Sequence, residues 1–132
     1  MVLKRAEQAL LTAKNAALKP VGLTLAQYVA LAELDLQPAI TSATLARACL
    51  VTPQAMMVVL KSLEEQGLIS RSPHARHPNV LELHITKAGQ EALHAGREQV
   101  APVEQRVIDA FTPKEIDKLD ALLHRLIAAV DD

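Results

Sequence analysis

Hydrophobic residues recur every three or four positions over most of this chain, which is the spacing of amphipathic helices. Threonines precede several of these segments, and a threonine hydroxyl before a first helical turn can cap a free backbone amide. Thr24, Thr52 and Thr112 are the clearest predicted caps, and Pro53 and Pro113 follow two of them at the first helical position, which suits proline. We predict six helices, over residues 2–19, 25–36, 42–49, 53–66, 87–110 and 113–130.

Two short stretches, residues 68–71 and 80–85, are predicted to be the paired strands of a hairpin. Residues 73–79 between them are polar and flanked by prolines, so they are predicted to form a tip in solvent. Ile40 is predicted to add a short strand beside the hairpin. Three apolar positions of the second strand are predicted to share one buried face: Leu81, Leu83 and Ile85.

The long helix over residues 87–110 contains two residues that disfavour helical structure. Gly96 and Pro102 are predicted to interrupt it, with a bend near residues 98–102, because proline removes a backbone hydrogen bond.

The terminal helices carry apolar stripes that the middle of the chain is too small to cover. A second copy of the chain is the favoured cover, and packing of the same stripes within one chain is the alternative. The residues concerned are Leu3, Leu10, Leu119, Leu123, Leu126 and Ile127.

These elements predict a mainly α fold with a small β-hairpin wing. In this interpretation the chain is a winged helix-turn-helix of six helices that dimerises through its N- and C-terminal helices. Residues 1–132 form a single domain, with a DNA-binding lobe over 23–90 and dimerisation helices over 1–22 and 91–132.

Composition and charge narrow this interpretation. Half of the 132 residues are hydrophobic but only 2% are aromatic, so the core is expected to be aliphatic. The net charge is −1, but residues 40–90 carry five basic against three acidic side chains, and residues 91–132 carry five against nine. Only the middle of the chain is therefore suited to face phosphates. No apolar run is long enough to span a bilayer and the start does not resemble a signal peptide, so we expect a cytoplasmic protein without membrane contact.

Two segments resemble the MarR family of winged helix-turn-helix regulators. Residues 63–71 (LEEQGLISR) are similar to the family's end of recognition helix and first wing strand, and residues 83–89 (LHITKAG) to its second wing strand and the start of helix five. The resemblance implies a homodimer, a palindromic DNA site and, in many members, release by a small ligand.

The chain departs from the family's pattern at three places. The family's Asp-Arg pair at the wing tip falls at about residues 77–79, whereas the arginine here is Arg76. The outer face of the fourth helix, usually rich in Ser, Thr and Arg, has Met57 and Val58. Leu50 stands in the turn where the family often has glycine.

The fourth helix carries the residues predicted to read bases in the major groove. Thr52 can donate to a phosphate or a base, and Gln54 can pair with adenine through two hydrogen bonds. Ala55, Met57 and Val58 cannot hydrogen-bond but can contact thymine methyl groups, which predicts a preference for A·T-rich sites. As alternatives, Gln54 is simply solvated, and Met57 and Val58 pack on the wing or on a partner.

Basic side chains elsewhere are predicted to contact the DNA backbone and minor groove. Lys61 and Arg47 are the candidates for phosphate contact, and Arg71 belongs to the same basic surface. Arg76, together with His74 or His77, is predicted to enter the minor groove.

A small apolar or phenolic effector is predicted to bind between the terminal helices and the DNA-binding lobe. Tyr28 is its expected hydrogen-bonding partner, and a closed core without a cavity is the alternative. The predicted lining is Leu11, Ala17, Val21, Leu25, Val29, Val100 and Val103.

No metal, cofactor or enzymatic activity is expected. His74 and His77 have metal-ligand spacing, but no acidic residue or cysteine near them in sequence completes a site. Cys49, the single cysteine, excludes an internal disulfide and is interpreted as a buried inert thiol rather than a peroxide sensor. No phosphate-binding loop or catalytic motif is present. The alternative function is a dimer that binds a small molecule or a protein and has lost strong DNA binding.

Overall fold

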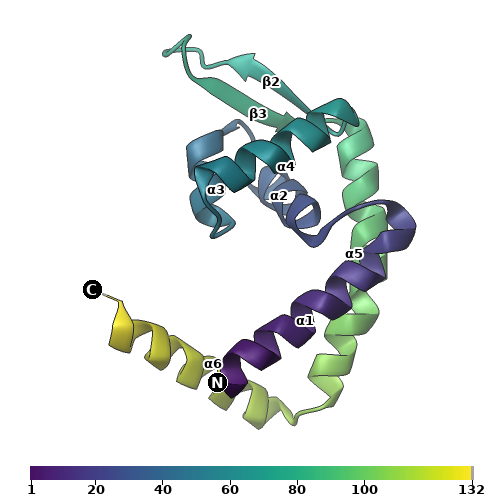
Figure 1. Ribbon diagram of the computed structural model, residues 1–132, viewed down its shortest axis with the longest axis vertical. Coiled ribbons are helices and arrows are strands. Elements are labelled where there is room, and N and C mark those ends of the chain that lie inside the picture. Colours follow the sequence, from purple (N-terminus) through teal and green to yellow (C-terminus); the bar gives the residue numbers. More distant parts are fainter. Residues whose placement is uncertain (132) are drawn as a thin grey trace. The chain divides into compact units, whose positions relative to one another are not determined.

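The computed structural model describes residues 1–131 and divides the chain into two compact units, residues 1–100 and a second unit from Ala101 onward. It confirms the six predicted helices and the hairpin (Figure 1). The helices are α1 (Val2–Leu18), α2 (Leu25–Leu36), α3 (Ser42–Ala48), α4 (Pro53–Glu65), α5 (Lys87–Asp109) and α6 (Pro113–Val130), and a single 3-10 turn, Lys19–Val21, follows α1. The strands are β1 (Ile40–Thr41), β2 (Ile69–Pro73) and β3 (Leu81–Ile85).

The predicted threonine caps are confirmed. Thr24 accepts a hydrogen bond from the Gln27 backbone amide at 3.1 Å, while the Gln27 side chain accepts one from the Thr24 amide at 2.9 Å. Thr112 and Glu115 form the same reciprocal capping box at the start of α6. These bonds satisfy backbone amides that have no partner inside the helix.

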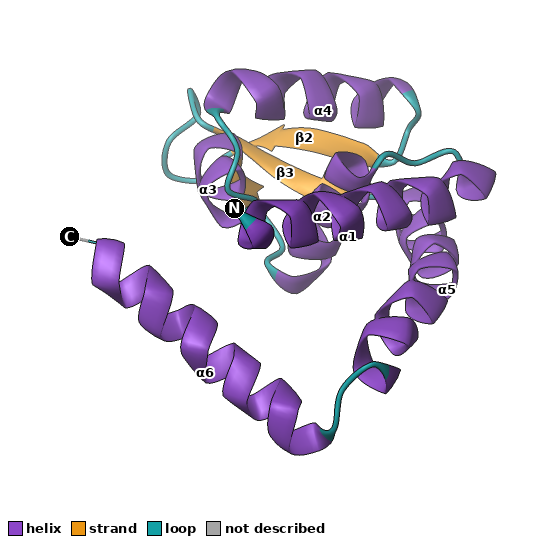
Figure 2. Ribbon diagram, turned by 60° about the horizontal axis from the view of Figure 1, so that its bottom comes forward, coloured by secondary structure: helices purple, strands orange, loops and turns teal. Residues whose placement is uncertain are grey.

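The first unit has an aliphatic core that joins α2, α3 and α4 to the sheet. The strand order is β1-β3-β2, all antiparallel, and Ile40 pairs with Leu83 as the predicted short strand requires. Figure 2 shows the strands alongside α4. The largest fully buried side chains of this core include Leu18, Leu31, Leu34, Leu45, Met56, Leu60, Leu63 and Leu83.

One prediction for the hairpin is wrong. Leu81 was expected on the buried face with Leu83, but 43% of its surface is exposed. The alternation correctly indicates that the two residues share a face, but β1 pairs only with Leu83 and Glu82. Leu81 lies beyond that pairing, opposite Pro73 in the two-stranded part of the hairpin.

The predicted interruption of α5 is also wrong, because the helix runs continuously from Lys87 to Asp109. Gly96 is a site of close packing instead: a Cβ atom there would lie 2.8 Å from Cδ1 of Tyr28. Pro102 removes a single amide donor, which the helix tolerates. The predicted bend near residues 98–102 stays a prediction.

The second unit contains α6, which carries an apolar stripe. None of the α6 residues is buried, and Leu119 and Leu126 are 42% and 40% exposed. Cover of this stripe by a second copy of the chain stays a prediction.

Among the described residues, no single helix is long and apolar enough to cross a membrane. The pair α3 and α4 passes that test of length and composition only when taken together, and the two helices are bent by 109° at their break.

Candidate nucleic-acid interface and an adjoining cavity

The turn between α3 and α4 has the backbone conformation that usually requires glycine. Leu50 occupies it with φ of 57°, and its side chain is 92% exposed. Thr52 then caps α4 by accepting a hydrogen bond from the Ala55 amide at 3.1 Å. Leu50 thus adopts the left-handed conformation that glycine takes without strain, at a cost of about 1–2 kcal/mol.

The two sides of α4 differ as the helical periodicity predicts. Met56, Leu60 and Leu63 are buried in the core. On the opposite side Met57 and Val58 are 64% and 72% exposed, which places both in solvent rather than against the wing. Thr52, Gln54, Ala55 and Lys61 are exposed as well. Two helical turns thus present a surface that is mainly apolar, with one amide and one cation.

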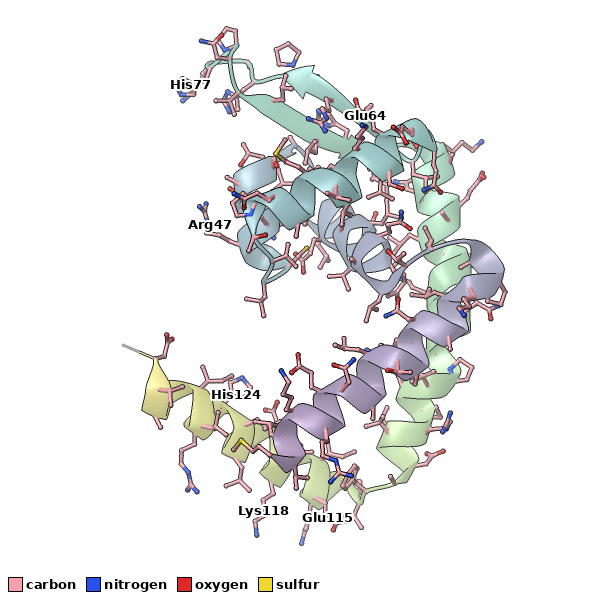
Figure 3. The ribbon with its side chains drawn as sticks, in the orientation of Figure 1. Arg47, Glu64, His77, Glu115, Lys118 and His124 are labelled. Carbon is pink, nitrogen blue, oxygen red and sulfur yellow. The ribbon has the colours of Figure 1, made fainter. Side chains whose placement is uncertain are left out.

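The wing is the β2–β3 hairpin with its connecting loop, residues 74–80. Figure 3 shows His77 at the tip of this loop and Arg47 projecting outward from α3. The Arg47 guanidinium also donates to the Thr44 hydroxyl at 3.3 Å, so it is partly held in place. Arg76 and His77 are both exposed.

Arg71 differs from the other predicted DNA-binding cations because it has an acidic partner. Its Nε lies 2.9 Å from Oε2 of Glu64 on α4. The pleat of β2 places Arg71 on the same face as Ile69, which turns it toward α4. Sequence reasoning missed this pair, and the role of Arg71 in DNA contact stays a prediction.

His74 lies only partly in solvent and is engaged in the loop itself. Its Nδ1 accepts hydrogen bonds from the backbone amides of Arg76 at 3.0 Å and His77 at 3.2 Å. Its Nε2 lies 3.6 Å from Oε1 of Glu82 on β3. Nδ1 of His74 is therefore occupied by two hydrogen bonds before any DNA is present, which the sequence pattern did not indicate.

The first unit contains an apolar cavity of about 330 Å³. It differs from the predicted pocket, with which it shares only Leu11, Leu25 and Val29. Its lining comes from α1, α2, the α3–α4 turn and α4: Leu11, Asn15, Leu25, Ala26, Val29, Cys49, Val51, Ala55, Met56 and Val59.

The remaining predicted lining residues do not line this cavity, and their role in binding an effector stays a prediction. Tyr28 occupies a neighbouring face of α2, where its ring packs against Gly96. Val100 is 1% and Val103 9% exposed, so both are closed off by packing. Ala17 and Val21 are partly buried and do not line the cavity.

Only two cavity residues are polar, and neither offers a free charge. Asn15 accepts from the Leu25 amide at 2.8 Å and donates to the Leu11 carbonyl at 3.1 Å. Cys49 is half-buried rather than buried as predicted, and burial, followed by the nearby Glu33 carboxylate, raises the pKa of its thiol. A raised pKa keeps the thiol protonated, which disfavours a peroxide-sensing role.

Within residues 1–131 no three histidine, cysteine or acidic side chains are grouped so that they hold a metal. His94 and His124 instead lie near acidic residues of their own helices, Glu98 and Asp120.

A helix-turn-helix followed by a β-hairpin wing, here α3 and α4 followed by β2 and β3, defines the winged helix-turn-helix class. Comparison with known proteins specifies the family. A sequence profile described as the MarR family matches residues 21–77. The HTH-type transcriptional repressor Rv2887 of Mycobacterium tuberculosis is 34% identical over 112 residues, covering 85% of this chain and 81% of that protein. The chain belongs to the MarR family of transcriptional regulators.

Solved structures agree with this assignment. The structure of Rv2887 in complex with salicylic acid has a TM-score of 0.74 at 33% identity and covers 95% of this chain and 93% of that one. The repressor CouR bound to a 23-mer DNA duplex has a TM-score of 0.87 at 25% identity, covering 95% and 89% of the two chains. The Staphylococcus aureus MepR–DNA complex, at 19% identity and a TM-score of 0.90 over 98% of this chain and 96% of that one, supports the fold alone.

Proposed function

We propose that this chain is a transcriptional repressor that binds a palindromic DNA site as a homodimer. The exposed outer side of α4, beside a wing with a cationic tip, carries this proposal. Relatives support it: Rv2887 is named a transcriptional repressor, and CouR was solved bound to a DNA duplex. Within this proposal residues 23–90 bind DNA, residues 1–22 and 91–132 dimerise, and the protein acts in the cytoplasm without enzymatic activity.

The proposed contacts divide into those that read bases and those that bind the backbone. Gln54 reads adenine, while Ala55, Met57 and Val58 contact thymine methyl groups. Thr52, Lys61 and Arg47 contact the backbone, Arg71 adds to the same surface when released from Glu64, and Arg76 reaches the minor groove.

Gln54→Ala should therefore cost about 1–3 kcal/mol of binding free energy at one base pair of the operator, as a lost bidentate contact does. Arg76→Ala should weaken binding to all sequences and reduce the dependence of affinity on salt. Band-shift titrations of the operator, single-base variants and unrelated duplexes, at two salt concentrations, measure both effects. An equal loss on every duplex for both variants would show that Gln54 reads no base. If the wild type binds none of these duplexes, the alternative remains of a dimer that binds an apolar ligand, which the cavity and the apolar α4 favour.

We further propose that an uncharged, apolar molecule occupies the cavity and releases DNA. Rv2887 was solved with salicylic acid, which is an anion at neutral pH, but none of the residues lining this cavity carries a positive charge. The carboxylate of Glu33 next to Cys49 further disfavours an anion. The same two turns of α4 supply Met56 and Val59 to the cavity and Met57 and Val58 to the outer surface, so a ligand can displace the DNA-reading side directly.

Naphthalene or indole should therefore raise the melting temperature and lower DNA affinity, whereas salicylate should do neither. Cys49 provides a direct measure of occupancy, because a ligand in the cavity should slow its reaction with a thiol reagent. Val29→Phe fills part of the cavity and should abolish these effects while DNA binding persists. Protection of Cys49 by salicylate in place of the neutral compounds would contradict the proposed ligand class.

A further inference from the structure

We propose that His74 is a positioning residue that holds the tip of the wing and thereby places Arg76. The proposal rests on the proposed binding of DNA by the wing. Nδ1 of His74 accepts hydrogen bonds from the amides two and three residues further along, those of Arg76 and His77. A single acceptor that bonds these two donors folds the chain into a tight turn, as the side chains of Asn and Asp do in many loops.

The rest of the loop is closed by two backbone bonds. His74 donates its amide to the Val80 carbonyl at 2.8 Å, and Val80 donates to the His77 carbonyl at 2.8 Å. Neither bond involves Arg76, whose amide is bonded to the His74 ring. The direction in which the Arg76 side chain leaves the tip therefore depends on that ring.

The hydrogen bonds also define the protonation state of the ring. Nδ1 accepts only when it carries no proton, so the neutral ring has its proton on Nε2, which faces Glu82 at 3.6 Å. A metal ion on Nε2 would compete with that proton, so this pattern does not suit a metal ligand.

The groups that face His74 are Glu82, which also lies 3.8 Å from Nε2 of His84, and the His77 ring at 5.3 Å between centroids. His84 itself is hydrogen-bonded to the Ser72 hydroxyl across the hairpin at 2.7 Å.

This replaces the prediction that His74 itself enters the minor groove. Its ring is used within the protein, and the side chain is only partly exposed. The ring stabilises the presentation of a neighbouring cation, and it contributes no charge of its own to DNA binding while it is neutral.

The test combines variants of His74 and Arg76 with two measurements. DNA affinity should fall for His74→Ala by a similar factor as for Arg76→Ala, on the order of tenfold, and the double variant should bind no worse than Arg76→Ala alone. His74→Asn, whose side-chain oxygen can accept the same amides, should restore most of the affinity. Ser70→Ala is the control, because Ser70 is an exposed residue of β2 outside the loop, and this variant should retain near wild-type affinity.

Hydrogen exchange at the Arg76 and His77 amides gives a measurement that is independent of DNA. Exchange at both amides should be faster in His74→Ala than in the wild type, but not in His74→Asn. The positioning role would be overturned if the double variant lost DNA affinity by the product of the two single losses. It would also be overturned if His74→Asn failed to restore binding. If Arg76→Ala binds DNA as tightly as the wild type, the proposed contact of Arg76 with DNA is wrong, although the proposed function stands. If the wild type binds no DNA, the proposed function fails, and the exchange data alone decide whether His74 holds the loop.

Discussion

Placing aspartate at both Leu119 and Leu126 should convert the protein from a dimer into a monomer. Both side chains lie seven residues apart on the open stripe of α6, at 42% and 40% exposure in the single chain. Burying two carboxylates in an apolar interface costs far more than the contacts there provide. Light scattering should report the 14.3 kDa chain mass for the double variant and about twice that mass for the wild type.

DNA affinity should fall with the dimer, by about 100-fold or more, because a monomer binds one half-site without the second. Ala121→Asp provides the matched control, since residue 121 lies on the side of α6 opposite the stripe and is exposed. This variant should remain dimeric. The first unit should melt normally in both variants, because neither substitution lies in it. A double variant that is still dimeric would contradict the proposed interface, and a wild-type monomer would contradict both the dimer and the palindromic site.

The elements of this fold were predictable because their determinants are local. Thr24 with Gln27 and Thr112 with Glu115 each lie three residues apart, and each pair alone specifies where a helix begins. The same holds for the periodic stripe of α4, in which Met56 and Leu63 are buried as predicted.

What the sequence did not reveal depends on elements that meet only in the folded chain. Gly96 was interpreted as a helix breaker because its neighbour Tyr28 comes from α2, far away in sequence. The cavity between α1, α2 and α4 was not anticipated for a similar reason. Periodicity indicates which faces of α1, α2 and α4 are apolar, but not where those faces leave space unfilled.

The candidate site was predicted in its location but not in its internal bonds. Gln54, Met57 and Val58 are exposed on α4 as expected, because helical spacing alone separates them from the core. The pairing of Arg71 with Glu64 and the two bonds accepted by His74 depend on strand register and loop geometry. The sequence therefore did not indicate that Arg71 and His74 are bonded within the protein, whereas Arg76 and His77 are exposed.

Gly89→Ala should be among the most destabilising single substitutions in the chain, although it adds one methyl group. Gly89 lies in the first turn of α5, where a Cβ atom would overlap the backbone carbonyl oxygen of Leu68 and lie 2.7 Å from Cγ1 of Ile85. That carbonyl accepts a hydrogen bond from the Thr86 amide at 3.0 Å. The Thr86 hydroxyl donates to the Gly67 carbonyl at 2.7 Å and accepts from the Gly89 amide at 3.0 Å.

These bonds attach the start of α5 to the turn between α4 and β2, so the added methyl group must displace backbone rather than a flexible side chain. We expect a loss of about 3 kcal/mol or more in the free energy of unfolding, at the upper end of the range for overpacking. Gly22→Ala makes the same chemical change where φ is +73° and nothing lies within 4 Å, so it should cost only the strain of a left-handed alanine, about 1 kcal/mol. Denaturant titration compares the two variants directly. Equal losses would mean that α5 can shift away from Leu68 without cost, and that the close contact at Gly89 does not hold the wing to the helix.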